Sequence, residues 1–371
     1  MQAKINNNEL FWLISLNLID GIGVKNAKNL ISYTGSVEAI FKENKKALIK
    51  IPGIGEYTAS KILNADVSKR AEKELEFINK YKIKTKSYFD NTYPFRLKQC
   101  EDAPLLFFYK GDVDFEHNKI VTIVGTRNNT EYGKENCKRI IKDLKERGHM
   151  PIIVSGLAYG TDICAHKEAI NNNLQTIAVL AHGLDRIYPS AHSSFAKEIP
   201  KNGALLTEFL SETKPDRQNF VRRNRIVAGL SDCTIVVESG EKGGSLITGD
   251  IANSYNRDVF AFPGEINKPY SKGCNKLIKT NKAALIESVL DLEYIMGWEI
   301  NKNIQTKLVI PPNLKPTEEL VYNIIKNKKS INIDILCHET KISSSDISII
   351  LLNLELQNII KSYPGNMYKL I

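Results

Sequence analysis

The chain has 371 residues, which is long for one domain and predicts two or three. Its 42% of apolar residues can fill an ordinary core, and its net charge of +9 favours an acidic partner. The apolar run at residues 11–19 is too short to cross a membrane and lacks the cationic stretch and cleavage pattern of a signal peptide. We therefore expect a cytoplasmic protein with no membrane partner.

Residues 1–80 are predicted to form a helical domain of the SAM-like or helix-hairpin-helix type. Two similar turns, residues 19–23 and 51–55, each contain a Gly-Ile-Gly sequence. In a helix-hairpin-helix turn, paired glycines reverse the chain and leave N–H groups free at the next helix N-terminus, where a DNA phosphate can bind. The alternative is that both turns only join the helices of a small bundle, and the few lysines nearby leave both interpretations open.

Residues 81–300 switch to short apolar runs that alternate with amphipathic helical stretches. Runs that are apolar on both faces predict a central parallel sheet covered by helices on both sides, which is a Rossmann-like α/β domain. The turn after the first run lacks the G-x-G-x-x-G spacing, so no NAD, FAD or other cofactor is expected. The predicted strands are residues 120–124, 152–155, 176–180, 204–208, 234–238 and 259–263.

Residues 301–316 contain three prolines and are predicted to be a linker, and residues 317–371 are predicted to form a winged-helix domain. Its expected recognition helix, residues 345–357, has no Lys or Arg and contains Asp346 and Glu355. These charges suit a major groove poorly. A docking or stabilising role is therefore favoured over base readout.

The six cysteines give no sign of a metal site. They form no C-x-x-C pair and no Cys/His cluster with the spacing of zinc ligands. Reduced, mostly buried thiols are the expectation. The residues are Cys100, Cys137, Cys164, Cys233, Cys274 and Cys337.

Turns rich in glycine, serine and arginine follow the predicted strands in order. At one edge of a parallel sheet, such turns point backbone N–H groups toward an anion. The arginines among them add bidentate phosphate contacts, which predicts a polyanion rather than one small cofactor. The turns are residues 124–127, 155–162, 220–225, 243–248 and 262–264.

In this order, the five turns resemble the core of the DNA-processing protein A family (DprA, also called Smf). The resemblance extends over residues 93–286 and includes further matches at residues 183–185, 188–189 and 273–275. It implies a bacterial protein of natural transformation that binds single-stranded DNA, protects it and helps to load the RecA recombinase. It also implies a homodimer without enzyme activity.

The turns and the resemblance together predict a set of DNA-binding residues. Arg127 lies in the family's glycine-x-arginine turn, where a guanidinium can fork onto a phosphate. The resemblance implies a phosphate contact at Arg217 and a base contact at Phe220, because a base can stack on a ring only outside a duplex. The alternatives are a core position for Phe220 and a helix-anchoring role for Arg225. The predicted residues are Gly125, Arg127, Ser155, Arg217, Phe220, Arg222, Asn224, Gly244, Ser245 and Thr248.

Two other classes of function compete with this prediction. Nucleotide phosphoribohydrolases of the lysine-decarboxylase-like group share the Rossmann type, but their Pro-Gly-Gly-x-Gly-Thr loop is not present here as one segment. Ser155, Asp162 and His166 have the residue types of a hydrolase triad, although structural hydrogen bonds are the favoured interpretation. A winged-helix DNA-binding regulator is the third class, and the acidic residues of its recognition helix argue against it.

Overall fold

The computed structural model contains two compact units, Met1–Asn301 and Lys302–Ile371, which are described separately. Most of the predicted linker at residues 301–316 lies outside the described residues. No helix in the described part of the chain is long and apolar enough to cross a membrane. The structure describes residues 7–298, 314–328, 331–357, 359–363 and 366–370.

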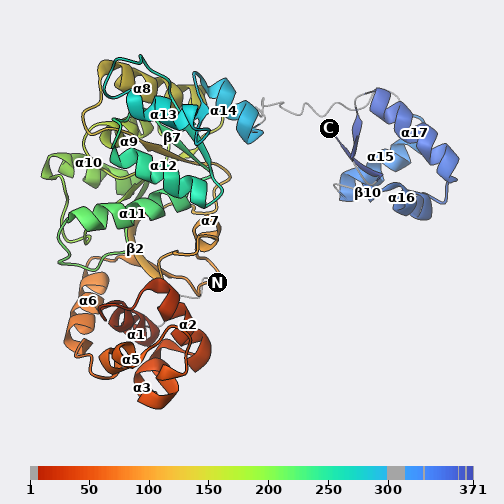
Figure 1. Cartoon of the computed structure of the whole chain (residues 1–371). Coiled ribbons are helices and arrows are strands. Elements are labelled where there is room, and N and C mark those ends of the chain that lie inside the picture. The colour runs from red at the N-terminus through yellow and green to blue at the C-terminus, as the bar shows by residue number, and fades with distance from the viewer. Residues whose placement is uncertain (1–6, 299–313, 329–330, 358, 364–365, 371) are drawn as a thin grey trace. The chain divides into compact units, whose positions relative to one another are not determined.

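The first unit begins with helices, as predicted, and both predicted turns lead into a helix N-terminus (Figure 1). Gly21 and Gly53 adopt φ values of +87° and +85°, a left-handed conformation that favours glycine. The helices are α1 (Asn7–Asn17), α2 (Val24–Thr34), α3 (Val37–Lys42), α4 (Lys45–Ile49), α5 (Glu56–Leu63) and α6 (Ser68–Lys80).

The two glycine turns brace each other. Lys61 on α5 donates a 3.1 Å hydrogen bond to the carbonyl of Asp20 in the first turn. Asn29 on α2 donates an equal 3.1 Å bond to the carbonyl of Pro52 in the second turn. Each turn is thus hydrogen-bonded to the helix that follows the other turn.

The strands described in this unit form one nine-stranded sheet with the order β1-β2-β6-β5-β4-β3-β7-β8-β9. From β6 to β9 every neighbouring pair is parallel, whereas β1 and β2 extend the β6 edge in antiparallel fashion. The six predicted strands correspond to β3 through β8. The strands are β1 (Lys84–Ser87), β2 (Leu106–Gly111), β3 (Ile120–Val124), β4 (Ile152–Ser155), β5 (Thr176–Val179), β6 (Gly203–Thr207), β7 (Cys233–Val236), β8 (Asp258–Ala261) and β9 (Ala284–Leu285).

Helices cover both faces of the sheet, which confirms the predicted α/β class (Figure 1). Ile120 of β3 packs in a core with Ile226 of α11, while the next residue, Val121, packs on the opposite face with Ile140 of α8. This alternation follows from the two-residue period of a strand. The helices are α7 (Phe95–Lys98), α8 (Glu131–Glu146), α9 (Thr161–Asn171), α10 (Ser193–Glu198), α11 (Arg217–Gly229), α12 (Gly244–Ser254), α13 (Lys272–Lys279) and α14 (Val289–Met296).

The second unit has the predicted winged-helix pattern. Its small sheet has the order β10-β12-β11 and packs with three helices around Leu336, Ile347 and Leu351. The opposite face of the last helix exposes Ile349 and Leu352, so it presents apolar rather than cationic side chains to solvent. The elements are α15 (Pro316–Lys328), β10 (Ile331–Asn332), α16 (Ile333–Thr340), α17 (Ser344–Leu356), β11 (Ile360–Tyr363) and β12 (Met367–Leu370).

Candidate nucleic-acid interface

The turns after β3 and β4 are in close contact at the carboxyl edge of the sheet. Thr161 donates its backbone N–H to the carbonyl of Thr126 at 3.1 Å. A Cβ atom at Gly125 would lie 2.3 Å from Oγ1 of Thr161, and one at Gly160 would lie 2.2 Å from the Thr126 carbonyl. Both glycines are therefore required by the close approach of the two turns. Gly125 shapes this edge, and Arg127 follows it at the surface.

Arg127, in the turn after β3, and Phe220 meet at this edge. The turn predicted at residues 220–225 is wrong, because these residues lie within the helix α11, and Phe220 is near its start. The guanidinium carbon of Arg127 lies 5.2 Å from the ring centroid of Phe220, within the range of a cation–π contact. The ring of Tyr188 lies 5.8 Å from that of Phe220 and is 44% exposed. We call Arg127, Tyr188 and Phe220 the edge cluster. It combines an exposed cation with two aromatic surfaces, of which Phe220 is half-buried.

Helical periodicity places two more predicted residues beside Phe220. Arg217, Phe220 and Asn224 have the spacing i, i+3 and i+7 on α11 and so share one face of the helix. Arg217 is exposed at the first turn of α11, and Asn224 is half-buried. The structure thus brings Arg127 to Phe220, and the helix places Arg217 and Asn224 on the face that carries Phe220.

Arg222 lies on a different face of α11. Its Nη2 donates to Oε2 of Glu208 at 2.8 Å, and Arg225 donates to the same oxygen and to the carbonyl of Asp102. The structure therefore does not place Arg222 in the edge cluster. For Arg225 it supports the helix-anchoring alternative, because this side chain is buried and both its contacts are internal.

Three predicted hydroxyl residues are buried within the turns. Ser155 donates to the carbonyl of Ile123 at 2.6 Å, and Ser245 donates to Oγ of Ser239 at 2.9 Å. Thr248 is also buried. A DNA strand bound at the surface cannot reach these hydroxyls. The structure therefore contradicts direct contacts between these three side chains and DNA, and leaves them a role in shaping the turns. Gly244, in contrast, is exposed with open space beside it.

Arg223 was not predicted as a site residue, yet it lies directly beneath the edge cluster. Its side chain is buried, its Nη1 donates to the carbonyl of Val179 at 2.5 Å, and its guanidinium carbon is 6.0 Å from the Phe220 centroid. Burial lowers the pKa of Arg223, although an arginine remains charged. A Cβ atom at Gly156 would lie 1.9 Å from Nη1, so that glycine makes room for the guanidinium.

The buried polar residues near Arg223 do not form a catalytic triad. Nδ1 of His166 contacts the hydroxyl of Thr176 at 2.7 Å, and the Ser155 hydroxyl is used by a backbone carbonyl. Burial, together with the charge of Arg223, lowers the pKa of His166 to about 3. Burial raises the pKa of Asp162, whereas Arg223 opposes that rise. These groups are tied into the fold rather than aimed at a substrate.

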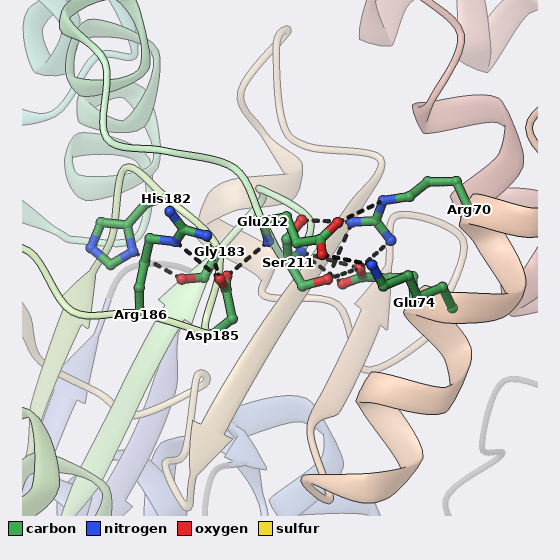
Figure 2. Close-up of polar contacts among 9 residues, drawn as sticks. Arg70, Glu74, His182, Gly183, Asp185, Arg186, Ser211 and Glu212 are labelled. Atoms are coloured by element: carbon green, nitrogen blue, oxygen red, sulfur yellow. Dashed lines mark hydrogen bonds and ion pairs between the residues drawn. The ribbon is translucent and has the colours of Figure 1, made fainter.

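A polar network joins the helical domain to this edge (Figure 2). Glu74 on α6 is buried and accepts the backbone N–H of Ser211 at 2.9 Å, while Arg70 donates to the Ser211 carbonyl at 2.6 Å. The next residue, Glu212, donates its N–H to Oδ1 of Asp185 at 2.9 Å. The loop after β6 is therefore held between α6 and residues 183–186.

The same network extends toward the edge cluster. His182, just before residues 183–186, accepts the backbone N–H of Tyr188 on Nε2 at 3.2 Å. Burial lowers the pKa of His182, which keeps this nitrogen available as an acceptor. Tyr188 is therefore held in place through its backbone. The sequence motif at residues 188–189 marked this position, but its contact with Phe220 could not be foreseen.

Family models match three parts of the chain. Residues 84–296 match DNA recombination-mediator protein A, residues 13–65 match the SAM-like helix-hairpin-helix tandem, and residues 309–366 match the DprA winged helix domain. These three matches, in the order of the described elements, define a DNA-processing protein of the DprA type. The chain belongs to the DNA recombination-mediator protein A family. All three parts of the predicted fold class are confirmed.

Individual relatives agree with this assignment. The chain is 33% identical to Protein Smf of Escherichia coli, over 80% of this chain and 79% of that protein. It is 42% identical to DNA processing protein DprA of Bacillus subtilis, over 52% of this chain and 65% of that protein. Protein Smf of Synechocystis sp. is 29% identical over 98% of this chain and 99% of its own length.

Two solved structures are similar over much of the chain. DNA processing protein A from Streptococcus pneumoniae aligns with a TM-score of 0.66 and 32% identity, covering 78% of this chain and 98% of that one. DNA processing protein A from Helicobacter pylori aligns with a TM-score of 0.52 and 29% identity, covering 58% and 95%. The Helicobacter pylori structure was described for its single-stranded DNA binding mode.

Proposed function

We propose that the chain binds single-stranded DNA along the carboxyl edge of the sheet. Arg127 and Arg217 hold phosphates, and Phe220 and Tyr188 offer their rings to unpaired bases. The observation that carries this proposal is the contact between Arg127 and Phe220, with 5.2 Å between the guanidinium carbon and the ring centroid. It brings a phosphate ligand and a stacking surface within reach of the same nucleotide. The described binding mode of the Helicobacter pylori relative supports it.

Competition between single-stranded and duplex oligonucleotides of matched length, across a salt series, tests this function. We expect preference for single strands with little dependence on sequence, because cations and stacking rings contact the backbone and the base faces. A chain lacking residues 315–371 should keep most of its affinity, since the edge cluster lies in the first unit. Equal or tighter binding of duplex by either chain would contradict the proposal.

We further propose that the chain acts as a homodimer through the surface around α14. Leu290 and Tyr294 are one turn apart on α14, and Tyr294 is 89% exposed. Leu285, on the sheet's edge strand β9, is also exposed. Edge strands and contiguous apolar patches favour pairing between copies. Leu290→Arg should give a monomer in sedimentation equilibrium, whereas Ile266→Arg, at another exposed apolar position, should leave the dimer intact.

The role in recombination proposed for the chain is to hand the bound strand to a RecA recombinase. A mediator must hold DNA and recombinase together, so the partner surface is expected to lie apart from the edge cluster. Family membership supports this step. Pull-down of RecA in saturating oligonucleotide tests it, and we expect RecA to be retained. Loss of RecA under those conditions would contradict separate surfaces.

A further inference from the structure

The last helix of the second unit carries an apolar stripe on its exposed side. Ile349, Leu352 and Leu356 of α17 are 58%, 57% and 74% exposed. They stand at positions i, i+3 and i+7, so they share one face of the helix, opposite the residues that fill the core. We call these three residues the α17 stripe. Leu320 on α15 and Ile335 on α16 are also exposed, but neither is part of such a row.

The width of the α17 stripe indicates what can cover it. Spacings of three and four residues form the a and d pattern of a coiled-coil seam, whereas a helix packed on a broad core carries a wider apolar face. The helix contains no Lys or Arg. Its two acids are used locally, because Asp346 accepts the hydroxyl of Ser343 at 2.6 Å and Glu355 accepts the backbone N–H of Ser362 at 2.9 Å. The stripe therefore suits another helix better than a phosphate backbone.

A second copy of α17 in antiparallel orientation matches the α17 stripe. Leu352, near its middle, would meet its own counterpart, and the two ends of the stripe would meet each other. On one flank, Asp346 would lie opposite Gln357 of the second copy. On the other flank, Glu355 would lie opposite Ser348, so no acid faces an acid. Opposed helix dipoles also favour this orientation, and a two-fold pair of identical surfaces is the commonest form of association.

The α17 stripe is too small to hold two chains together by itself. Stable interfaces bury about 1,200–2,000 Å² in total, and three partly exposed side chains from each copy supply only part of that area. Two copies joined at the surface around α14 would present their stripes to each other at an effective concentration on the order of millimolar. A weak contact can then form without the entropic cost of bringing two free chains together.

We propose that the α17 stripe pairs with the same stripe of a second copy and forms a second contact within the homodimer. This inference rests on the proposed homodimer and extends it, because it gives the winged-helix unit a protein partner in place of a DNA groove. Each contact strengthens the dimer, since the chains remain joined at one contact when the other opens.

Cysteine cross-linking of the full chain tests the pairing. Leu352→Cys is combined with Cys337→Ser, which removes the one native cysteine that is not buried. Ile335→Cys in the same background is the matched control, at another exposed apolar position of this unit. Diamide oxidises two thiols that meet to a disulfide and takes up their two hydrogen atoms. We expect Leu352→Cys to run as a disulfide-linked dimer on a non-reducing gel and Ile335→Cys to run as a monomer.

Leu352→Lys tests the pairing without cysteine chemistry. A charge at the middle of the stripe should raise the dissociation constant of the homodimer roughly a hundredfold in sedimentation equilibrium, the lower end of the gain from linking two contacts. Leu320→Lys, at an exposed position outside the stripe, should leave it unchanged. Both positions are exposed, so thermal unfolding of both variants should match that of the unaltered chain.

A dimeric chain in which Leu352→Cys links no more than Ile335→Cys would overturn the α17 pairing alone, and so would an unchanged dissociation constant for Leu352→Lys. If the unaltered chain sediments as a monomer, the proposed homodimer falls and this inference with it. Cross-linking of Leu352→Cys that persists after Leu290→Arg is added would overturn the dependence of the pairing on the surface around α14.

Discussion

The two faces of α11 use the same residue types for opposite purposes. One face carries Arg217 at the surface and Phe220 in the edge cluster, whereas the other carries Arg222 and Arg225, both paired with Glu208. The segment is rich in cations, but only part of that charge is free for a ligand. Charge counted along a sequence therefore overstates the charge available to DNA, and the period of the helix decides which cations remain.

The largest predicted difference between the two faces is the change in the free energy of unfolding when an arginine is replaced. Arg225→Met leaves Glu208 with one buried partner fewer, and removal of one member of a buried ion pair costs about 3–5 kcal/mol. Arg217→Met, at an exposed position, should change the free energy of unfolding by only about 0.5 kcal/mol. Urea denaturation measures both. Equal stability of the two variants would remove the distinction between an anchoring face and a binding face.

A smaller effect is expected on affinity at the binding face. Phe220→Ala should weaken single-strand binding by about 1–3 kcal/mol through loss of a stacking surface, with an unchanged salt slope because no charge is lost. Phe89→Ala removes another exposed phenyl ring, away from the edge cluster, and should bind normally. A marked fall in the melting temperature of Phe220→Ala, with normal binding by the folded protein, would instead make Phe220 a core residue.

The sequence was sufficient for most of the fold because its parallel strands are apolar on both faces. Two strands of this sheet were not predicted: β1, whose residues are polar, and β9, which has only two residues and therefore no detectable period. The β2 strand was also missed, although its apolar side chains are buried. An antiparallel edge strand need not follow the alternation of strands and helices that identified the others.

The candidate site was predictable in outline and not in detail. Arg127 follows β3 at the carboxyl edge of the sheet, as the strand pattern implied, but Phe220 reaches this edge from α11, where residues 220–225 were predicted as a turn. The burial of Ser155 and Ser245 could not be foreseen, because the same hydroxyl can cap a turn or bind a ligand. Glu208 was predicted as a strand end, and its pairing with Arg222 and Arg225 depends on the packing of α11 beside the sheet.

The smallest predicted difference concerns one phosphate at the edge cluster. Arg127→Ala removes an exposed cation, so the slope of log affinity against log salt should become shallower by about 0.7, the single-strand value for one phosphate contact. Arg222→Ala removes the same charge from the opposite face and serves as the control. With an oligodeoxythymidylate of about 4 nucleotides, too short to contact both faces of α11, the salt slope of Arg222→Ala should equal that of the unaltered chain. Because Arg127 also lies over the Phe220 ring, its loss should reduce affinity further through the cation–π contact, by about 0.5–1 kcal/mol at high salt. An unchanged slope for Arg127→Ala would remove the first turn from the site, and equal changes in both variants would mean that the short strand reads both faces of α11.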